Sequence, residues 1–119
     1  MKPSLEVSDS VIVRRFVGEI SQDDIIESWK ELFDRFQDLD PYSGLVIDLL
    51  NAKISQDRNK FREMVEYLRQ EADRLEEKKI AYLMDTPQVT QVILLDHQLS
   101  QLQIRPFATL QGALDWIRI

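Results

Sequence analysis

The chain has 119 residues, a formal net charge of −6 at pH 7 and no cysteine. A chain of this length can bury one core, so we expect residues 1–119 to form a single domain. The acidic balance argues against a nucleic-acid partner, and the lack of cysteine excludes disulfides, a thiolate nucleophile and cysteine-ligated metals.

The first ten residues lack the apolar core of a signal peptide. No apolar run approaches the roughly 20 residues that a membrane-spanning helix needs. We therefore expect no transmembrane segment and a cytoplasmic location.

The chain is expected to begin with a β-hairpin. Two β-prone segments, residues 5–7 and 11–17, flank the turn-forming tripeptide 8–10. β-Branched residues favour strands, and serine and aspartate favour turns. Gly18 is expected to end the second strand, which should be buried mainly at its start.

A helix is expected next. Ser21 supplies an N-cap and Asp24 an acid in the first turn, where the helix dipole favours negative charge. Apolar residues then recur at three- and four-residue spacing as far as Leu39. Pro41 is expected to stop this helix.

The central strand is predicted from the apolar run that begins at Gly44 and contains one carboxylate, Asp48. A polar turn should follow it. A second helix is expected from about Asp57 to Lys78, apolar on one side and densely charged on the other.

The remaining elements continue the alternation of strands and helices. Ile80 to Met84 is predicted to be a short strand ending before Asp85, and Thr86–Pro87 is a helix start signal. A last strand around 104–107 leads to a final helix capped by Thr109. This order predicts an α/β fold with a mixed sheet of four to five strands and four helices.

Three segments together resemble STAS domains, the SpoIIAA-like family of anti-sigma-factor antagonists. Val11–Ile20 is similar to their opening strand and turn, and Gly44–Leu49 to their hydrophobic strand ending in Asp-Leu. Arg105–Ile117 resembles the closing strand and helix of the STAS/SEC14-like subgroup. The resemblance implies a SpoIIAA-like fold and a non-enzymatic regulatory domain that contacts protein partners through the loop and helix after the central strand.

The chain departs from the antagonist pattern in that loop. Antagonist proteins carry an Asp-Ser-Ser-Gly motif there, whose serine is phosphorylated by a partner kinase. The corresponding segment here is Ile54-Ser55-Gln56-Asp57-Arg58. It has no Ser-Ser-Gly, so Ser55 does not map onto the phosphorylated serine.

This loop and the start of the following helix nevertheless form the candidate contact surface. Cations in a first helical turn oppose the helix dipole, unless an anion or an acidic partner binds there. A solvated surface is the alternative. The candidate contact residues are Lys53, Ser55, Asp57, Arg58 and Arg62.

Asp48 and Asp85 are expected at the carboxyl ends of two strands, the edge where open α/β sheets gather their sites. They either share a cation or, as we favour, accept hydrogen bonds from the backbone of their own turns. His97 is the only histidine, and no catalytic triad, metal-ligand set or phosphate-binding loop is present. We expect no enzyme activity, no metal and no cofactor.

Val92, Leu94 and Leu95 belong to a run of adjacent apolar residues that cannot all lie on one helix face. The favoured interpretation is a helix buried on more than one side. The next is a homodimer surface. The third, which the SEC14-like resemblance implies, is an apolar groove for a small apolar or acyl ligand.

Overall fold

The computed structural model describes residues 3–55, 57–85 and 89–119. Within these ranges the chain forms five strands and five helices. In chain order they are β1 (Ser4–Ser8), β2 (Val11–Ile20), α1 (Gln22–Arg35), β3 (Gly44–Ile54), α2 (Arg58–Gln70), α3 (Ala72–Leu75), β4 (Lys79–Leu83), α4 (Val89–Gln98), β5 (Gln103–Phe107) and α5 (Leu110–Ile117).

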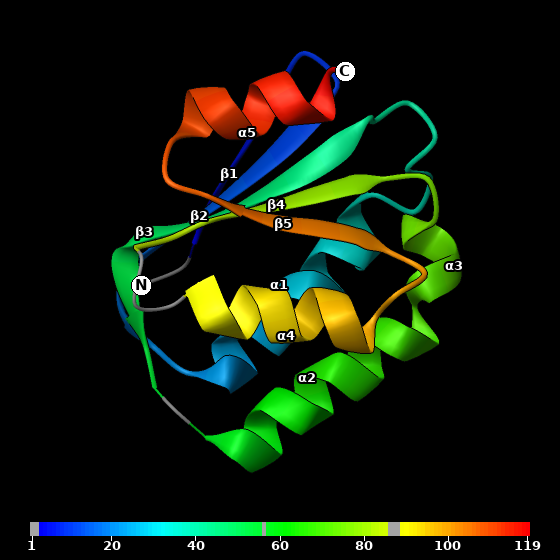
Figure 1. Cartoon of the computed structure of the whole chain (residues 1–119). Helices are drawn as coiled ribbons and strands as arrows, with labels where there is room; N and C mark the ends of the chain where they lie inside the picture. Colours follow the sequence, from blue (N-terminus) through cyan, green and yellow to red (C-terminus); the bar gives the residue numbers. More distant parts are fainter. Residues whose placement is uncertain (1–2, 56, 86–88) are drawn as a thin grey trace.

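The five strands form one mixed sheet in the order β1-β2-β3-β4-β5 (Figure 1). The hairpin partners β1 and β2 are antiparallel, and every later neighbour pair is parallel. Helical crossovers connect the parallel strands, as parallel pairing requires. The predicted α/β class with a mixed sheet is therefore confirmed, with one helix more than expected.

The helices cover the two faces of the sheet unequally. In Figure 1, α1, α2, α3 and α4 lie on one face and α5 lies alone on the other. The main core lies on the first face, where Trp29 of α1 and Leu68 of α2 are almost fully buried. The smaller core lies beneath α5, where Val46 and Leu83 of the sheet contact Ala113 and its neighbours.

The hairpin and the cap of α1 agree with the sequence, but two boundaries were wrong. Gly18 does not end β2, because it adopts a φ of +88° that a glycine tolerates, and the strand continues to Ile20. Ser21 forms a capping box with Asp24, as expected. The helix ends at Arg35, well before Pro41, and the chain reaches the next strand through a non-helical segment.

The central strand β3 is longer than predicted. A bulge at Leu49 and Leu50 places two residues of β3 opposite one residue of β2, and pairing then resumes through Ile54. The residues expected as a polar turn therefore belong to the strand. Asp48 accordingly lies inside β3 and not at its end.

The long second helix is interrupted. α2 ends at Gln70, and Glu71 has φ −100° and ψ 11°, after which α3 makes one further turn. The apolar pattern continues across this break, because Ala72 and Leu75 of α3 are buried in the same core. Periodicity alone therefore could not reveal it.

The C-terminal elements follow the prediction. The Thr86–Pro87 start signal lies outside the described residues, but α4 and β5 occupy the expected positions. The Thr109 hydroxyl accepts a hydrogen bond from the Gly112 amide, at 3.1 Å, and so caps α5. Among the described residues, none of the helices is both long and apolar enough to cross a membrane.

Candidate functional site

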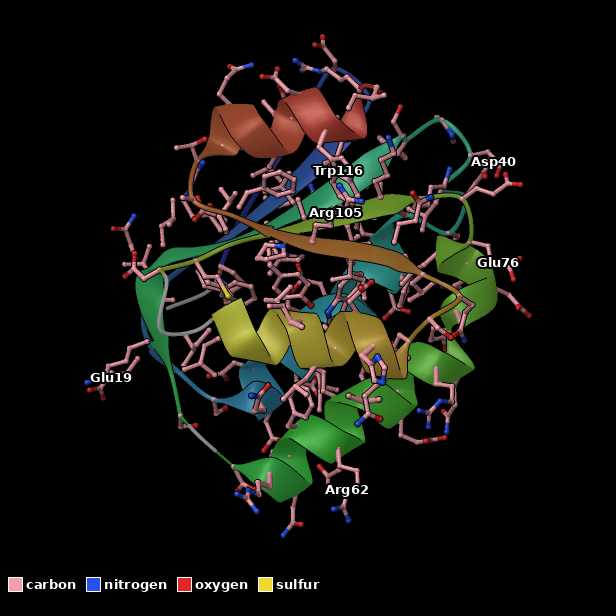
Figure 2. All side chains as sticks on the ribbon, viewed as in Figure 1. Glu19, Asp40, Arg62, Glu76, Arg105 and Trp116 are labelled. Carbon is pink, nitrogen blue, oxygen red and sulfur yellow. The ribbon has the colours of Figure 1, made fainter. Side chains whose placement is uncertain are left out.

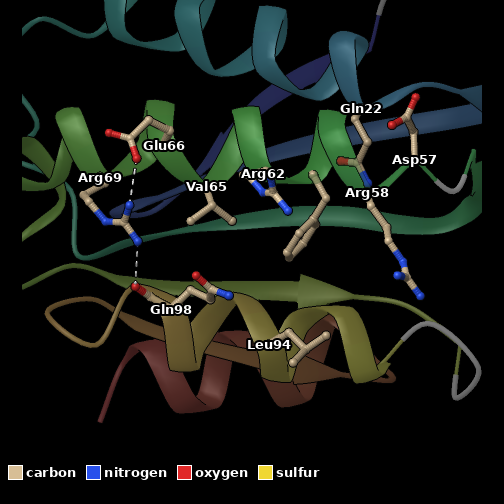
Figure 3. Close-up of a pocket in the computed structure, with 10 residues that line it drawn as sticks. Gln22, Asp57, Arg58, Arg62, Val65, Glu66, Arg69, Leu94 and Gln98 are labelled. Carbon is tan, nitrogen blue, oxygen red and sulfur yellow. Dashed lines mark hydrogen bonds and ion pairs between the residues drawn. The ribbon is translucent and has the colours of Figure 1, made fainter.

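A groove of about 850 Å³ separates α2 from α4 on the four-helix face of the sheet (Figure 3). Its apolar lining comes from Phe61 and Val65 of α2 and Leu94 of α4. At one end, the Arg69 guanidinium donates to the backbone oxygen of Gln98 at 3.5 Å. This contact links the C-terminal ends of the two helices and closes that end of the groove.

One face of α2 supplies the charged side of the groove. Arg58, Arg62, Val65 and Arg69 follow one another at spacings of four, three and four residues, so they share one face of the helix. The helix begins after Asp57, whose carboxylate accepts hydrogen bonds from two amides of the first turn. The arginine stripe is therefore held on a capped helix and not on a loop.

The structure brings some of the predicted contact residues together. Asp57, Arg58 and Arg62 line the groove, and Leu94 faces them from α4. Lys53 and Ser55 are exposed but do not line it. The Ser55 amide instead donates to the backbone oxygen of Ile20, at 3.0 Å, beside the end of the strand pair.

The basic side chains around α2 differ in how they are paired. Lys60 reaches both Asp23 of α1 and Glu63, each at 3.4 Å, and hydrogen bonds to these carboxylates, Asp23 first, raise the pKa of Lys60. Arg69 pairs with Glu66 at 2.7 Å. Among the described residues, Arg58 and Arg62 form no ion pair.

The apolar run of α4 divides between core and surface, so the favoured interpretation of a helix buried on more than one side was wrong. Val92 and Leu95 are each 2% exposed and belong to the core. Val92 and Leu95 are therefore not surface residues, because both lie on the helix face that packs on the sheet. Ile93 and Leu94 are 57% and 48% exposed, so only Leu94 of the three predicted residues reaches the groove.

The two predicted strand-end carboxylates have different surroundings. Asp48 is buried, and its two oxygens accept hydrogen bonds from Arg15 Nε at 2.9 Å and from the Leu50 amide at 3.0 Å. Asp85 follows β4 and is exposed. The described part of the chain contains no group of three or more acids or histidines that could hold a metal ion.

Sequence reasoning missed a buried residue of the groove, Gln22. It is 2% exposed, its side-chain oxygen has no hydrogen-bond partner in the described part of the chain, and it lines the α2–α4 groove. Gln22 and Phe61 also line a small adjoining cavity of about 20 Å³, next to Tyr82 of β4. A glutamine at the start of a helix is usually exposed, so the sequence carried no signal for this burial.

Burial also affects the Tyr82 phenol, which is 3% exposed and has no hydrogen-bond partner among residues 3–55, 57–85 and 89–119. Burial raises its pKa above the ordinary value of 10.0. The phenol therefore stays protonated at neutral pH and cannot serve there as a base.

The fold is similar to those of several solved structures. The anti-sigma factor antagonist SpoIIAA in its unphosphorylated form aligns over 98% of this chain and 97% of its own, with a TM-score of 0.62 and 15% identity. An anti-sigma factor antagonist from Mycobacterium paratuberculosis aligns over 98% and 93%, with a TM-score of 0.63 and 20% identity.

A third similar structure is an uncharacterised protein of the DUF3478 family, with a SpoIIAA-like fold, from Shewanella loihica. It aligns over 97% of this chain and 91% of its own, with a TM-score of 0.62 and 15% identity. No protein-family model and no curated protein sequence matches the chain. The chain thus has the SpoIIAA-like fold that its sequence pattern predicted.

Proposed function

We propose that residues 1–119 are a single STAS-like domain, a non-enzymatic regulator of the cytoplasm that binds a protein partner through the start of α2 and the adjoining groove. The proposal rests on one observation: the exposed Leu94 lines the same groove as Asp57, Arg58 and Arg62. The similar solved structures include proteins named as anti-sigma factor antagonists, which supports a regulatory role.

The chemistry of the groove also favours binding over catalysis. Its charged side chains are arginines and carboxylates on a helix surface, and arginines are enriched where proteins meet. Asp48 has both oxygens occupied by Arg15 and the Leu50 amide, so this buried carboxylate is already committed to the fold.

A pulldown with charge-reversed protein tests the proposal. The variant Arg58→Glu with Arg62→Glu is compared with the wild type as bait in an extract of the source cells. We expect the partner of the wild type to be lost, because reversing two interface charges places like charges opposite the partner. Equal capture by both baits would contradict the proposal.

The matched control is Arg105→Glu with Arg118→Glu, which changes the net charge by the same amount. Figure 2 shows Arg105 beside Trp116 near α5, across the sheet from Arg62 on α2. Arg118 lies at the end of α5, paired with Asp9 at 3.0 Å. If the control pair also abolishes capture, net charge and not the groove determines binding, and the proposed contact surface is wrong.

The alternative function is carriage of a small apolar or acyl ligand. The observation that favours it is the groove volume of about 850 Å³, which falls within the range of small-molecule sites. Native mass spectrometry of the purified protein distinguishes the two functions. A carrier is expected to retain a ligand as added mass, whereas the mass of the bare chain argues against a tightly held ligand.

A further inference from the structure

The groove has the chemistry of a site for an acidic amphipathic helix. An apolar floor of Phe61, Val65 and Leu94 lies beside a rim that carries Arg58 and Arg62. Figure 3 shows Arg62 and Val65 projecting from α2 toward the space that Leu94 enters from α4. Grooves between helices receive partner helices when apolar anchors fit the floor and charges match the rim.

The positive charge on the rim of the groove favours a partner whose contact surface is acidic. Arg58 and Arg62 have no ion pair among the described residues, whereas Lys60 and Arg69 already have acidic partners. Two carboxylates also line the groove, but Asp57 accepts hydrogen bonds from the first-turn amides of α2 and Glu66 pairs with Arg69, so the positive charges of Arg58 and Arg62 remain for a partner. In a chain of net charge −6, this locally basic surface attracts carboxylates.

A second groove on the same molecule has the opposite charge. It has a volume of about 670 Å³ and lies along α1, where Asp24, Glu27, Glu31 and Asp34 line it. These acids repel an acidic helix. The charge pattern therefore directs such a partner to the α2–α4 groove and away from α1.

A buried acceptor lies at one end of the same groove. The Gln22 side chain is 2% exposed, its oxygen has no donor among the described residues, and it lines the groove near Arg58 (Figure 3). Buried acceptors normally receive a hydrogen bond, so this oxygen needs a donor, which one water molecule or a side chain inserted from the groove can supply. The adjoining cavity of about 20 Å³ has room for roughly one water molecule and not for an acyl chain.

We infer that the α2–α4 groove binds an amphipathic helix of a partner protein, with apolar side chains on Val65 and Leu94 and carboxylates on Arg58 and Arg62. The inference rests on the proposed function and specifies the partner's chemistry. The 13 residues of α2 span about 20 Å, so a partner helix of similar length can lie along the groove.

The test uses a designed helical peptide of about 18 residues, with leucines on one face and glutamates flanking them. Its control replaces every glutamate with glutamine. Binding to the full chain is followed by amide chemical shifts. We expect shifts within 58–69 and 94–98, and at least about tenfold tighter binding of the glutamate peptide. Equal affinities, shifts confined to other elements, or no binding of either peptide at about 1 mM would overturn the inference.

Variants locate the binding surface. Leu94→Asp is expected to weaken the glutamate peptide at least about tenfold, because it places a carboxylate on the apolar floor. Ile93→Asp, at a residue that is more exposed and does not line the groove, is the matched control and should leave affinity unchanged. Equal loss in both variants would overturn the inference.

The Leu94→Asp variant also separates this inference from the proposed function. In the pulldown, loss of the partner with Arg58→Glu and Arg62→Glu but retention with Leu94→Asp would support the proposed function and overturn the groove inference. If the partner is lost with the arginine double variant and also with Leu94→Asp, and the glutamate peptide binds, the proposed function and the groove inference are both supported. Oleate that displaces the peptide and shifts the same amides more strongly would identify an acyl site instead. A dimer in sedimentation that Leu94→Asp converts to a monomer would mean that a second copy covers the groove, and would also overturn the inference.

Discussion

Arg15 and Asp48 stand opposite each other on the parallel strands β2 and β3, and Arg15 Nε donates to Asp48 Oδ2 at 2.9 Å. The carboxylate is buried, whereas the guanidinium is one-third exposed. The other Asp48 oxygen accepts the Leu50 amide at the bulge. Asp48 therefore links β3 to β2 and also stabilises the backbone of the bulge in β3.

We expect Asp48→Ala to lower the free energy of unfolding by about 2 kcal/mol, because it leaves the Leu50 amide without an acceptor and removes the partner of Arg15. Urea unfolding measures the change. The control is Glu6→Gln, since Glu6 is an exposed partner of Arg15 at 3.5 Å, and it should cost less than about 0.5 kcal/mol. Equal costs would show that burial of Asp48 contributes nothing.

Adjacent leucines of α4 should differ sharply in their contribution to stability. Leu95→Ala is expected to cost about 3 kcal/mol, because it leaves a cavity in the core. Leu94→Ala should cost less than about 0.5 kcal/mol, because Leu94 is 48% exposed. Thermal or urea unfolding compares the two. A large cost for Leu94→Ala would mean that the groove residue supports the fold.

Gly44 lies where β3 passes close to β4 and α5. A Cβ at this position would collide with the Lys79 backbone oxygen and approach Ile117 Cγ2 to 2.9 Å. We expect Gly44→Ala to cost about 1 to 3 kcal/mol through overpacking. Gly112→Ala, where the nearest atom is a side-chain oxygen at 3.1 Å, is the comparison and should cost less. Chemical denaturation measures the free energy of unfolding of the two variants. A larger loss for Gly112→Ala than for Gly44→Ala would contradict this prediction.

Tyr82 should make stability fall in alkaline solution. Its folded pKa is raised by burial, so above about pH 10 the unfolded chain releases the phenolic proton while the folded chain keeps it. The free energy of unfolding then decreases as pH rises, by about 1 kcal/mol at about pH 11. Tyr82→Phe removes this contribution.

The measurement is urea unfolding of wild type and Tyr82→Phe at about pH 7 and about pH 11. Burial also raises the pKa of Tyr67, but Tyr67 is present in both chains, so the difference isolates Tyr82. At neutral pH we expect Tyr82→Phe to be neutral or stabilising by up to about 1 kcal/mol, because no described residue pairs with the buried hydroxyl. Parallel pH profiles would contradict this account.

The sequence predicted the elements that depend on local signals. Ser21 and Thr109 marked the starts of two helices. The alternation of apolar strands with amphipathic helices predicted the α/β sheet. Their signals lie within a few residues, so they can be read without knowing the fold. The resemblance to SpoIIAA-like proteins then predicted the fold that the structure has.

The features that sequence missed depend on partners far along the chain. The bulge in β3 arises from pairing with β2, so nothing near Asp48 predicted that the strand would continue past it. The groove joins Arg58 of α2 to Leu94 of α4, and only packing against the sheet brings these helices together. Gln22 likewise lines cavities together with residues of α2, α4 and the sheet, and local composition gives no sign of this burial.

The strand order also has a consequence for how the chain assembles. Across the sheet, the strands lie in the order in which they occur along the chain. Each strand after the hairpin can therefore add to an edge that already exists, without insertion between earlier partners. Residues after β5 then cover Val46 and Leu83 through α5, so a nascent chain that has completed only the sheet presents those two side chains to chaperones or to other nascent chains.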